Sequence, residues 1–292
     1  MFGTQNVLKG ILEKEYGFTE IDRHDIRINV LGINHFTWLN YASYKGLDLF
    51  PIYQNYVDKH FAHGYEDTGE HWANKSFECL QRVKFDLFNR YGYIAAAGDR
   101  HLAEFVNGEE YLKDPQTVKD WDFGLTTVAW RKENLIARQE KSNRLKAFEE
   151  EVKLEETGEE GILLIKALCG LESVVSNVNI PNSGRQIKNF PEETIVETNA
   201  LFERDSIRPI YAGEMPQNLV ELMTPHIENH ELIYTAAITA NVELVMEAFA
   251  NDPLIGNRLS EDENRQLVLD MINNTKEYLP KEWAICLEKY QK

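Results

Sequence analysis

The stretch that decides the fold is Asp-Ile-Arg-Ile-Asn-Val-Leu-Gly-Ile-Asn-His-Phe-Thr-Trp-Leu, residues 25–39. Before the glycine, apolar side chains alternate with polar ones at Ile26, Ile28 and Val30. This period of two predicts a half-buried strand, and the alternation resumes at Phe36. We therefore expect two strands joined by a turn at Gly32 to His35, which would let one nitrogen of the imidazole point into a cleft.

The rest of the chain predicts helices with a second group of strands. Helical spacing of apolar residues or capping signals predict helices over 6–16, 52–61, 76–91, 127–154, 161–168, 219–250 and beyond Ser260. The helix over 219–250 should be interrupted near Pro225, because proline removes a backbone donor. Alternation predicts strands over 173–180 and 194–202, with a loop over 208–216. The sequence shows no repeats or linkers, so we expect one domain, 1–292.

Composition narrows the classes of function. The formal net charge of −17 excludes a nucleic-acid partner, which needs a basic face. No apolar run approaches ~18 residues, so we expect no membrane span, and the N-terminus lacks a secretory pattern. The three cysteines are odd in number and widely spaced, which indicates reduced thiols and a cytoplasmic protein.

Two histidine groups have spacings that resemble metal sites. His60, His63 and His71 lie in a polar, loop-like region with nothing to force them together. His226 and His230 are one helical turn apart, but they lack the His-Glu-x-x-His pattern of zinc proteases. We expect structural or interface roles for both groups.

Residues 32–38, Gly-Ile-Asn-His-Phe-Thr-Trp, resemble the metal-binding histidine segment of family 4 of the glycoside hydrolases, which are NAD- and manganese-dependent. Further blocks resemble that family in the same order. They are Tyr91-Gly92-Tyr93 with 98–105, Asn179 to Gly184, Phe190 to Glu197, and Asn251 to Leu254. The resemblance covers nearly the whole chain, which is identified as the C-terminal half of such an enzyme.

The resemblance implies an α+β fold like that of the C-terminal catalytic domains of lactate and malate dehydrogenases. The family's N-terminal Rossmann half, with its Gly-x-Gly segment and metal-binding cysteine, has no counterpart in this sequence. We therefore expect that the chain alone lacks NAD-dependent glycosidase activity and that its first helix exposes an apolar face. A separate N-terminal half is a possible partner.

The resemblance also implies redox-assisted elimination rather than the usual pair of carboxylates. NAD takes a hydride from carbon 3, a base removes the acidified carbon 2 proton, the glycosidic oxygen leaves, and Mn²⁺ polarises the carbon 3 oxygen. His35 is carried over as the metal ligand. Asp99 is predicted as the base, with Tyr93 and Tyr91 as alternatives, and we expect Asp99 and His35 to share one cleft.

Three further residues are predicted to contact the sugar. Asn34, Arg100 and His101 suit sugar hydroxyls, and Arg100 also suits a substrate carboxylate. The residues before Gly32 look most like the α-glucosidase and α-galacturonidase branch, so the expected substrate is a small α-glucoside or α-galacturonide. Family members are usually homo-oligomers. The open alternatives are a non-catalytic remnant, a fragment that needs its N-terminal half, and the substrate domain of a hydroxy-acid dehydrogenase.

Overall fold

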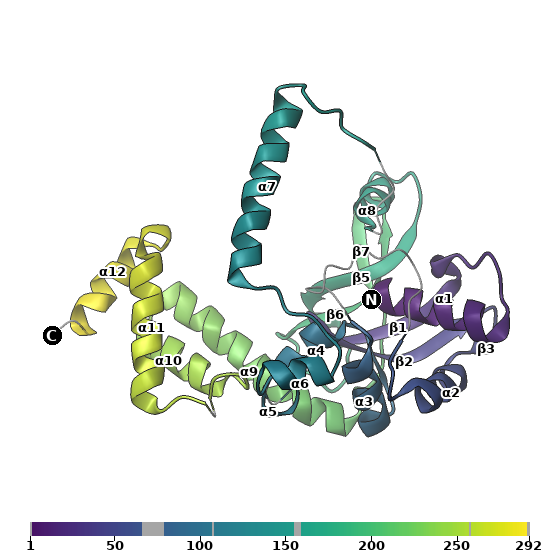
Figure 1. The fold of residues 1–292 in the computed structure, drawn as a ribbon, viewed down its shortest axis with the longest axis horizontal. Coiled ribbons are helices and arrows are strands. Elements are labelled where there is room, and N and C mark those ends of the chain that lie inside the picture. Colours follow the sequence, from purple (N-terminus) through teal and green to yellow (C-terminus); the bar gives the residue numbers. More distant parts are fainter. Residues whose placement is uncertain (1, 66–78, 107, 155–158, 257, 291–292) are drawn as a thin grey trace.

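The structure is a computed structural model that describes residues 2–65, 79–106, 108–154, 159–256 and 258–290. Its helices are α1 Phe2–Tyr16, α2 Phe50–His60, α3 Arg82–Tyr91, α4 Asp99–Phe105, α5 Gly108–Tyr111, α6 Pro115–Asp120, α7 Val128–Lys146, α8 Gly161–Leu168, α9 Gln217–Thr239, α10 Val242–Asn251, α11 Glu261–Thr275 and α12 Lys281–Leu287. Its strands are β1 Ile26–Ile33, β2 Phe36–Tyr44, β3 Leu47–Asp48, β4 Ile94–Ala95, β5 Val174–Pro181, β6 Ile195–Glu203 and β7 Ser206–Pro209. Figure 1 shows a central body of strands and helices, from which α7 and the α9–α12 arm extend.

The first sheet is built on the hairpin predicted from residues 25–39. β1 and β2 pair antiparallel, and Ile33 pairs with Phe36 on either side of the turn. β2 also pairs with β3 and β4. Gly32 has φ +150°, and a Cβ there would lie 2.4 Å from the Phe36 carbonyl oxygen, so only glycine lets the strands meet at the turn. The hairpin prediction is confirmed.

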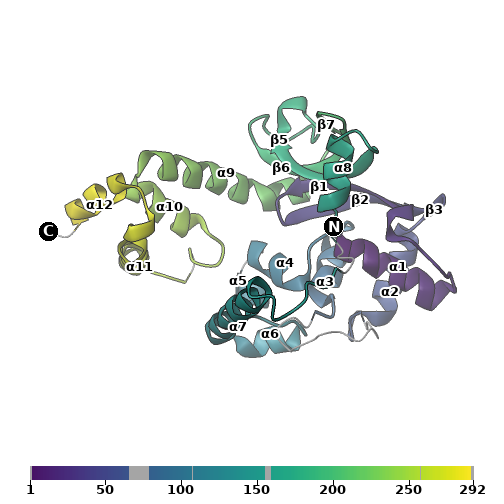
Figure 2. The same ribbon diagram turned by 90° about the horizontal axis from the view of Figure 1, so that it is seen from above.

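The second sheet is antiparallel and runs in the order β5–β6–β7. It lies against β1, and the Asn199 side chain donates a hydrogen bond of 2.8 Å to the Ile28 carbonyl oxygen. α8 packs on β6 through a small cluster that includes Ala167 and Phe202. Figure 2 shows this sheet crossing above the β1–β2 hairpin.

Two large apolar cores flank the first sheet. One lies beneath the His35 turn and contains Phe36, Trp38 and Leu102, and the other joins α1, α2 and α3 to the hairpin. The apolar face of α1 belongs to this second core, with Val7, Leu8, Ile11 and Leu12 all buried. The prediction of an exposed apolar face on the first helix is therefore wrong, because β1, α2 and α3 cover it.

Several element boundaries differ from the prediction. α9 continues through Pro225, with the Thr224 hydroxyl donating to the Val220 carbonyl oxygen, and ends at Thr239, because the next residue, Ala240, has φ +49°. α7 ends at Lys146 rather than 154, because Phe148 adopts φ +58°. Its expected apolar stripe is exposed. α3 begins at Arg82, whereas the start expected at residue 76 lies outside the described residues.

Two further points concern the arm and the expected loop over 208–216. Residues 206–209 form the edge strand β7, so the first part of the expected loop is a strand.

The arm has a core of its own between α10, α11 and α12, and α11 begins with the predicted Ser260–Glu263 capping box. Among the described residues no helix is long and apolar enough to cross a membrane.

A buried lysine connects α3 to α1. The Lys84 side chain is 1% exposed, and its Nζ donates a hydrogen bond of 2.8 Å to the Thr4 hydroxyl. Burial lowers the pKa of Lys84 to about 8, while nearby Cys79 and Asp99 act in the opposite direction. Because the charged form is the one that burial disfavours, Lys84 reduces stability at neutral pH.

We expect Lys84→Met to raise the free energy of unfolding by about 2 kcal/mol at pH 7. The folded pKa lies below the unfolded value of 10.5. The unfolded chain therefore binds more protons above about pH 8, and the wild type gains stability up to about pH 10. Urea unfolding at pH 7 and pH 9.5 should show the advantage of Lys84→Met shrinking. The control Lys59→Met, at an exposed residue, should show no such trend, and an advantage independent of pH would contradict the argument.

Candidate active site

The turn between β1 and β2 presents His35 at the surface. His35 has φ +62°, a left-handed conformation that a side chain rarely adopts without support. Its backbone N–H donates to Oε2 of Glu197 over 3.3 Å. The other carboxylate oxygen of Glu197 accepts a hydrogen bond from Asn177. The second sheet thus fixes the conformation of the turn that carries His35.

A second imidazole lies beside the first. The rings of His35 and His101 are 5.0 Å apart, at an interplanar angle of 75°. His101 lies on α4, whose apolar residues Leu102 and Ala103 anchor it in the core beneath the turn. Partial burial lowers the pKa of His101, and the neighbouring His35 and Arg100 lower it further. The neutral imidazole, which is the form that binds metals, is therefore favoured.

Two charged side chains on α4 complete the group. Arg100 and Glu104 are four residues apart, so they share a face of the helix. Partial burial raises the pKa of Glu104, while electrostatic interactions with Arg100 and His35 lower it. We call His35, Arg100, His101 and Glu104 the imidazole cluster. It combines two imidazoles, a guanidinium and a carboxylate.

Asp99 lies outside this cluster. Its side chain is fully buried, and Oδ1 accepts a hydrogen bond of 3.0 Å from the Lys84 backbone N–H. Burial raises the pKa of Asp99 to about 6, while the backbone amides of Lys84, Val83 and Arg82 act in the opposite direction. The carboxylate therefore lies at the first turn of α3, whose amides have no partners within the helix. Asp99 thus lies in the core at the start of α3, whereas His35 is exposed on the hairpin turn.

The remaining predicted residues lie near the turn. Asn34 is exposed beside His35. Tyr93 precedes β4, which pairs with Trp38 and Leu39, and it packs against the core beneath the turn. Tyr91 contacts Trp38 edge to face at 5.5 Å, and partial burial raises its pKa. Of the three predicted bases, Asp99 is buried, while Tyr93 and Tyr91 are partly exposed.

Three residues of the site were missed by the sequence reasoning. Glu197 closes a block quoted for the resemblance, and Glu104 follows Arg100 by one helical turn, so both carried a signal. Asn177 sits in an ordinary strand and carried none. Its role depends on the register that pairs it with Asn199 and places it beside Glu197.

The other histidine groups have structural contacts. His226 bonds to the Phe105 carbonyl oxygen over 2.7 Å and packs on the rings of Phe36 and Phe105. His60 stacks on Tyr56 and lies 3.4 Å from Glu15. The expected structural roles agree with these contacts, while His71 lies outside the described residues.

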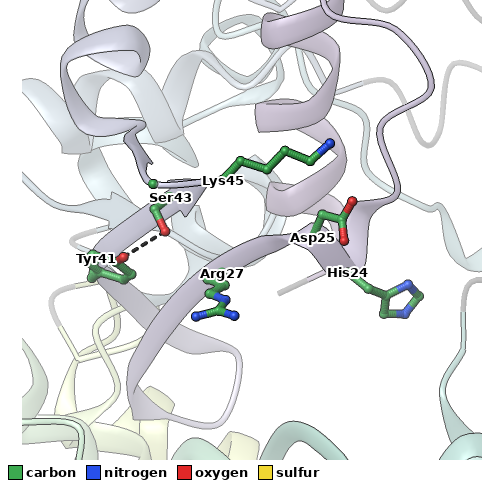
Figure 3. A pocket seen from close by; sticks show the side chains of 7 residues that line it. His24, Asp25, Arg27, Tyr41, Ser43 and Lys45 are labelled. Carbon is green, nitrogen blue, oxygen red and sulfur yellow. Dashed lines mark hydrogen bonds between the residues drawn. The ribbon is translucent and has the colours of Figure 1, made fainter.

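Figure 3 shows a pocket of about 430 Å³ at the other end of the hairpin, lined by His24, Asp25, Arg27, Tyr41, Ser43 and Lys45. Arg27 is eight residues from His35 along the hairpin, roughly 26 Å for extended chain. The Arg27 and Lys45 side chains point in different directions in Figure 3. This pocket is separate from the imidazole cluster.

The imidazole cluster suits a divalent metal only in part. Neutral imidazoles suit Mn²⁺ or a similar ion, but catalytic metal sites commonly have three protein ligands. Within the described ranges no three His, Cys, Asp or Glu side chains gather closely enough to hold an ion. NAD fits less well, because both described sheets are antiparallel and the sequence has no Gly-x-Gly loop to bind its phosphates.

Comparison with known proteins identifies relatives of this chain. The family 4 glycosyl hydrolase C-terminal domain matches residues 30–255. The chain is 63% identical over 285 residues to an α-galacturonidase of Lachnoclostridium phytofermentans, covering 98% of this chain and 61% of that protein. It superposes on the putative glucosidase lplD of Bacillus subtilis with a TM-score of 0.85 and 42% identity, covering 92% of this chain and 61% of that one.

A third similarity concerns the fold alone. A 6-phospho-α-glucosidase from gut microorganisms, solved in complex with NAD and Mn²⁺, superposes with a TM-score of 0.69 at 17% identity, over 95% of this chain and 60% of that one. The expected α+β fold is confirmed, and the alternative of a hydroxy-acid dehydrogenase domain is wrong. The chain spans about 60% of the length of the curated α-galacturonidases that it matches. On this evidence the chain belongs to family 4 of the glycosyl hydrolases and corresponds to the C-terminal part of its members.

Proposed function

We propose that this chain is the substrate-binding part of an α-galacturonidase that depends on NAD and Mn²⁺. The observation that carries the proposal is the 63% identity to an α-galacturonidase over 98% of the chain. A solved relative with the same fold binds both NAD and Mn²⁺. α-Galacturonides are therefore preferred over α-glucosides as the substrate.

In this proposal His35, Arg100 and His101 of the imidazole cluster each have a role. His35 is a ligand of Mn²⁺, which as a Lewis acid polarises a sugar oxygen. Arg100 binds the substrate carboxylate, since a guanidinium can donate two parallel hydrogen bonds to it. Asn34 and His101 contact sugar hydroxyls, and Tyr93 is the preferred base. Glu197 acts through the His35 backbone and is a positioning residue.

The remaining metal ligand and the NAD site are proposed to lie outside the described residues. We also propose that the whole chain, 1–292, acts as one unit, that it self-associates, and that it works in the cytoplasm. The three cysteines are free, which suits a reducing compartment. The alternative of a fragment that works beside a separate N-terminal half is compatible with this function. The alternative of a non-catalytic remnant is incompatible with it.

The proposal predicts that the chain hydrolyses α-galacturonides only when it is joined to the part of the enzyme that it does not span. The chain is assayed with NAD, Mn²⁺ and nitrophenyl α-galacturonide, alone and fused to the part of the L. phytofermentans enzyme that it does not span. We expect background turnover alone and clear turnover in the fusion. Turnover by the chain alone would contradict the division of labour. An inactive but folded fusion, beside an active intact L. phytofermentans enzyme, would contradict the function.

A further inference from the structure

The helix α7 is uncovered along its whole length. It has 19 residues, and none of them is buried. Figures 1 and 2 show it projecting from the body, clear of both sheets and of the α9–α12 arm. Isolated helices of this length are only marginally stable in water, and most helices in proteins are held by packing of an apolar face. α7 therefore has the character of a helix whose packing partner lies outside the single chain.

The exposed face of α7 is both apolar and basic. Val128, Leu135 and Ile136 share one side of the helix by their spacing, and Leu135 and Ile136 are 57% and 56% exposed. Lys132 lies on the same side, and Arg138 flanks it. The helix has six Lys and Arg residues against two Glu, although the whole chain carries a net charge of −17. Its partner should thus be apolar and acidic.

The same chain has a groove of that kind. A groove of about 540 Å³ lies between α9 and the start of β6. Its apolar lining includes Ile195 and Tyr234, which are 49% and 62% exposed, and its acidic lining is Glu193 and Glu231. On α9, Tyr234 and Ile238 follow Glu231 on one side of the helix, and Ile238 is also exposed. The region 217–290 as a whole has thirteen acidic residues against five basic ones.

We infer that α7 of one copy docks into the groove between α9 and β6 of a second copy. An amphipathic helix in an apolar groove is a common mode of recognition, and opposite charges at the rim fix the partner. Because both surfaces belong to one chain, a two-fold pair of copies fills both grooves at once. The inference deepens the self-association proposed above, and it can fail while the catalytic assignment holds.

The inference is tested by reversing the charges on α7 in one variant and the charges at the groove in another. The helix variant is Lys132→Glu with Arg138→Glu, and the groove variant is Glu193→Lys with Glu231→Lys. All four side chains are exposed, so both variants should keep the circular dichroism of the wild type. The control for the helix variant is Arg27→Glu with Lys45→Glu, which makes the same change in net charge on the far end of the hairpin.

Sedimentation velocity, run over a micromolar range of protein concentration, measures how strongly two copies of the chain associate. The wild type and the control should dimerise, and each docking variant should show a dissociation constant raised at least about tenfold. Mixing the helix and groove variants should restore dimers, because both contacts in the mixed pair then join opposite charges. A monomeric wild type, a helix variant that dimerises as the control does, or a mixture that stays monomeric would overturn the inference.

Discussion

Replacing Asp99 with alanine should lower the free energy of unfolding by about 1–2 kcal/mol, because the loss of a buried hydrogen-bond acceptor exceeds the gain from removing a carboxylate whose pKa burial raises to about 6. The carboxylate accepts from the Lys84 amide, and the amides of Arg82 and Val83, the other first residues of α3, favour its charged form. Gln81, the residue before them, makes no side-chain cap. Without Asp99 these donors are buried and unpaired, and the contact of α3 with both large cores is weakened.

Urea unfolding followed by circular dichroism measures this loss. Asp99→Asn keeps one acceptor oxygen and should lose less than Asp99→Ala. Asp58 is the matched control, because it is exposed on α2 and accepts only from Gln54, so Asp58→Ala should stay within about 0.5 kcal/mol. If Asp99→Ala were as stable as the wild type, the capping role would be wrong and Asp99 would return as a candidate base.

Replacing Arg100 with methionine should reduce kcat/KM for an α-galacturonide at least about 100-fold in the fusion with the missing part, and leave a neutral α-galactoside nearly unchanged. A charge-assisted hydrogen-bond pair supplies about 3 kcal/mol, which corresponds to this factor. Methionine preserves most of the apolar length of the side chain. The loss should therefore follow the charge of the substrate and not the fold of α4.

The conservative variant separates charge from shape. Arg100→Lys should recover part of the activity on the galacturonide, since lysine keeps the charge but loses the paired geometry. Steady-state kinetics on both substrates gives the ratio directly. Equal losses of kcat/KM on the charged and the neutral sugar would show that Arg100 does not bind the substrate carboxylate. Arg100 would then act on the packing of the imidazole cluster.

Local patterns were sufficient for most of the secondary structure. The alternation before Gly32 and the Ser260–Glu263 capping box each depend on neighbouring residues, and both appear as expected. Pro225 shows the limit of such rules, because α9 continues through it. The first helix shows a second limit of such rules, because its apolar face is covered by elements that follow it in the chain.

The site was harder to predict because it depends on contacts between distant segments. The hairpin pattern placed His35 at a turn and the family resemblance implied its role, while the structure shows that His101 is its neighbour. Asp99 lies two residues from His101, yet its carboxylate enters the core as a cap for α3. Sequence proximity and small neighbouring residues do not reveal which way a side chain points. Likewise, the support of His35 by Glu197 depends on how the second sheet lies against the first.

The most direct test of the imidazole cluster is a titration of the chain with Mn²⁺, followed through the ring NMR signals of its eight histidines. Paramagnetic broadening marks the rings nearest the ion and needs no enzymatic activity. The account predicts that the signals of His35 and His101 broaden first and together, before those of His60 and His226, and that His35→Ala removes the effect at His101. Earlier broadening at His60 or His226, or unchanged broadening of His101 in His35→Ala, would contradict it.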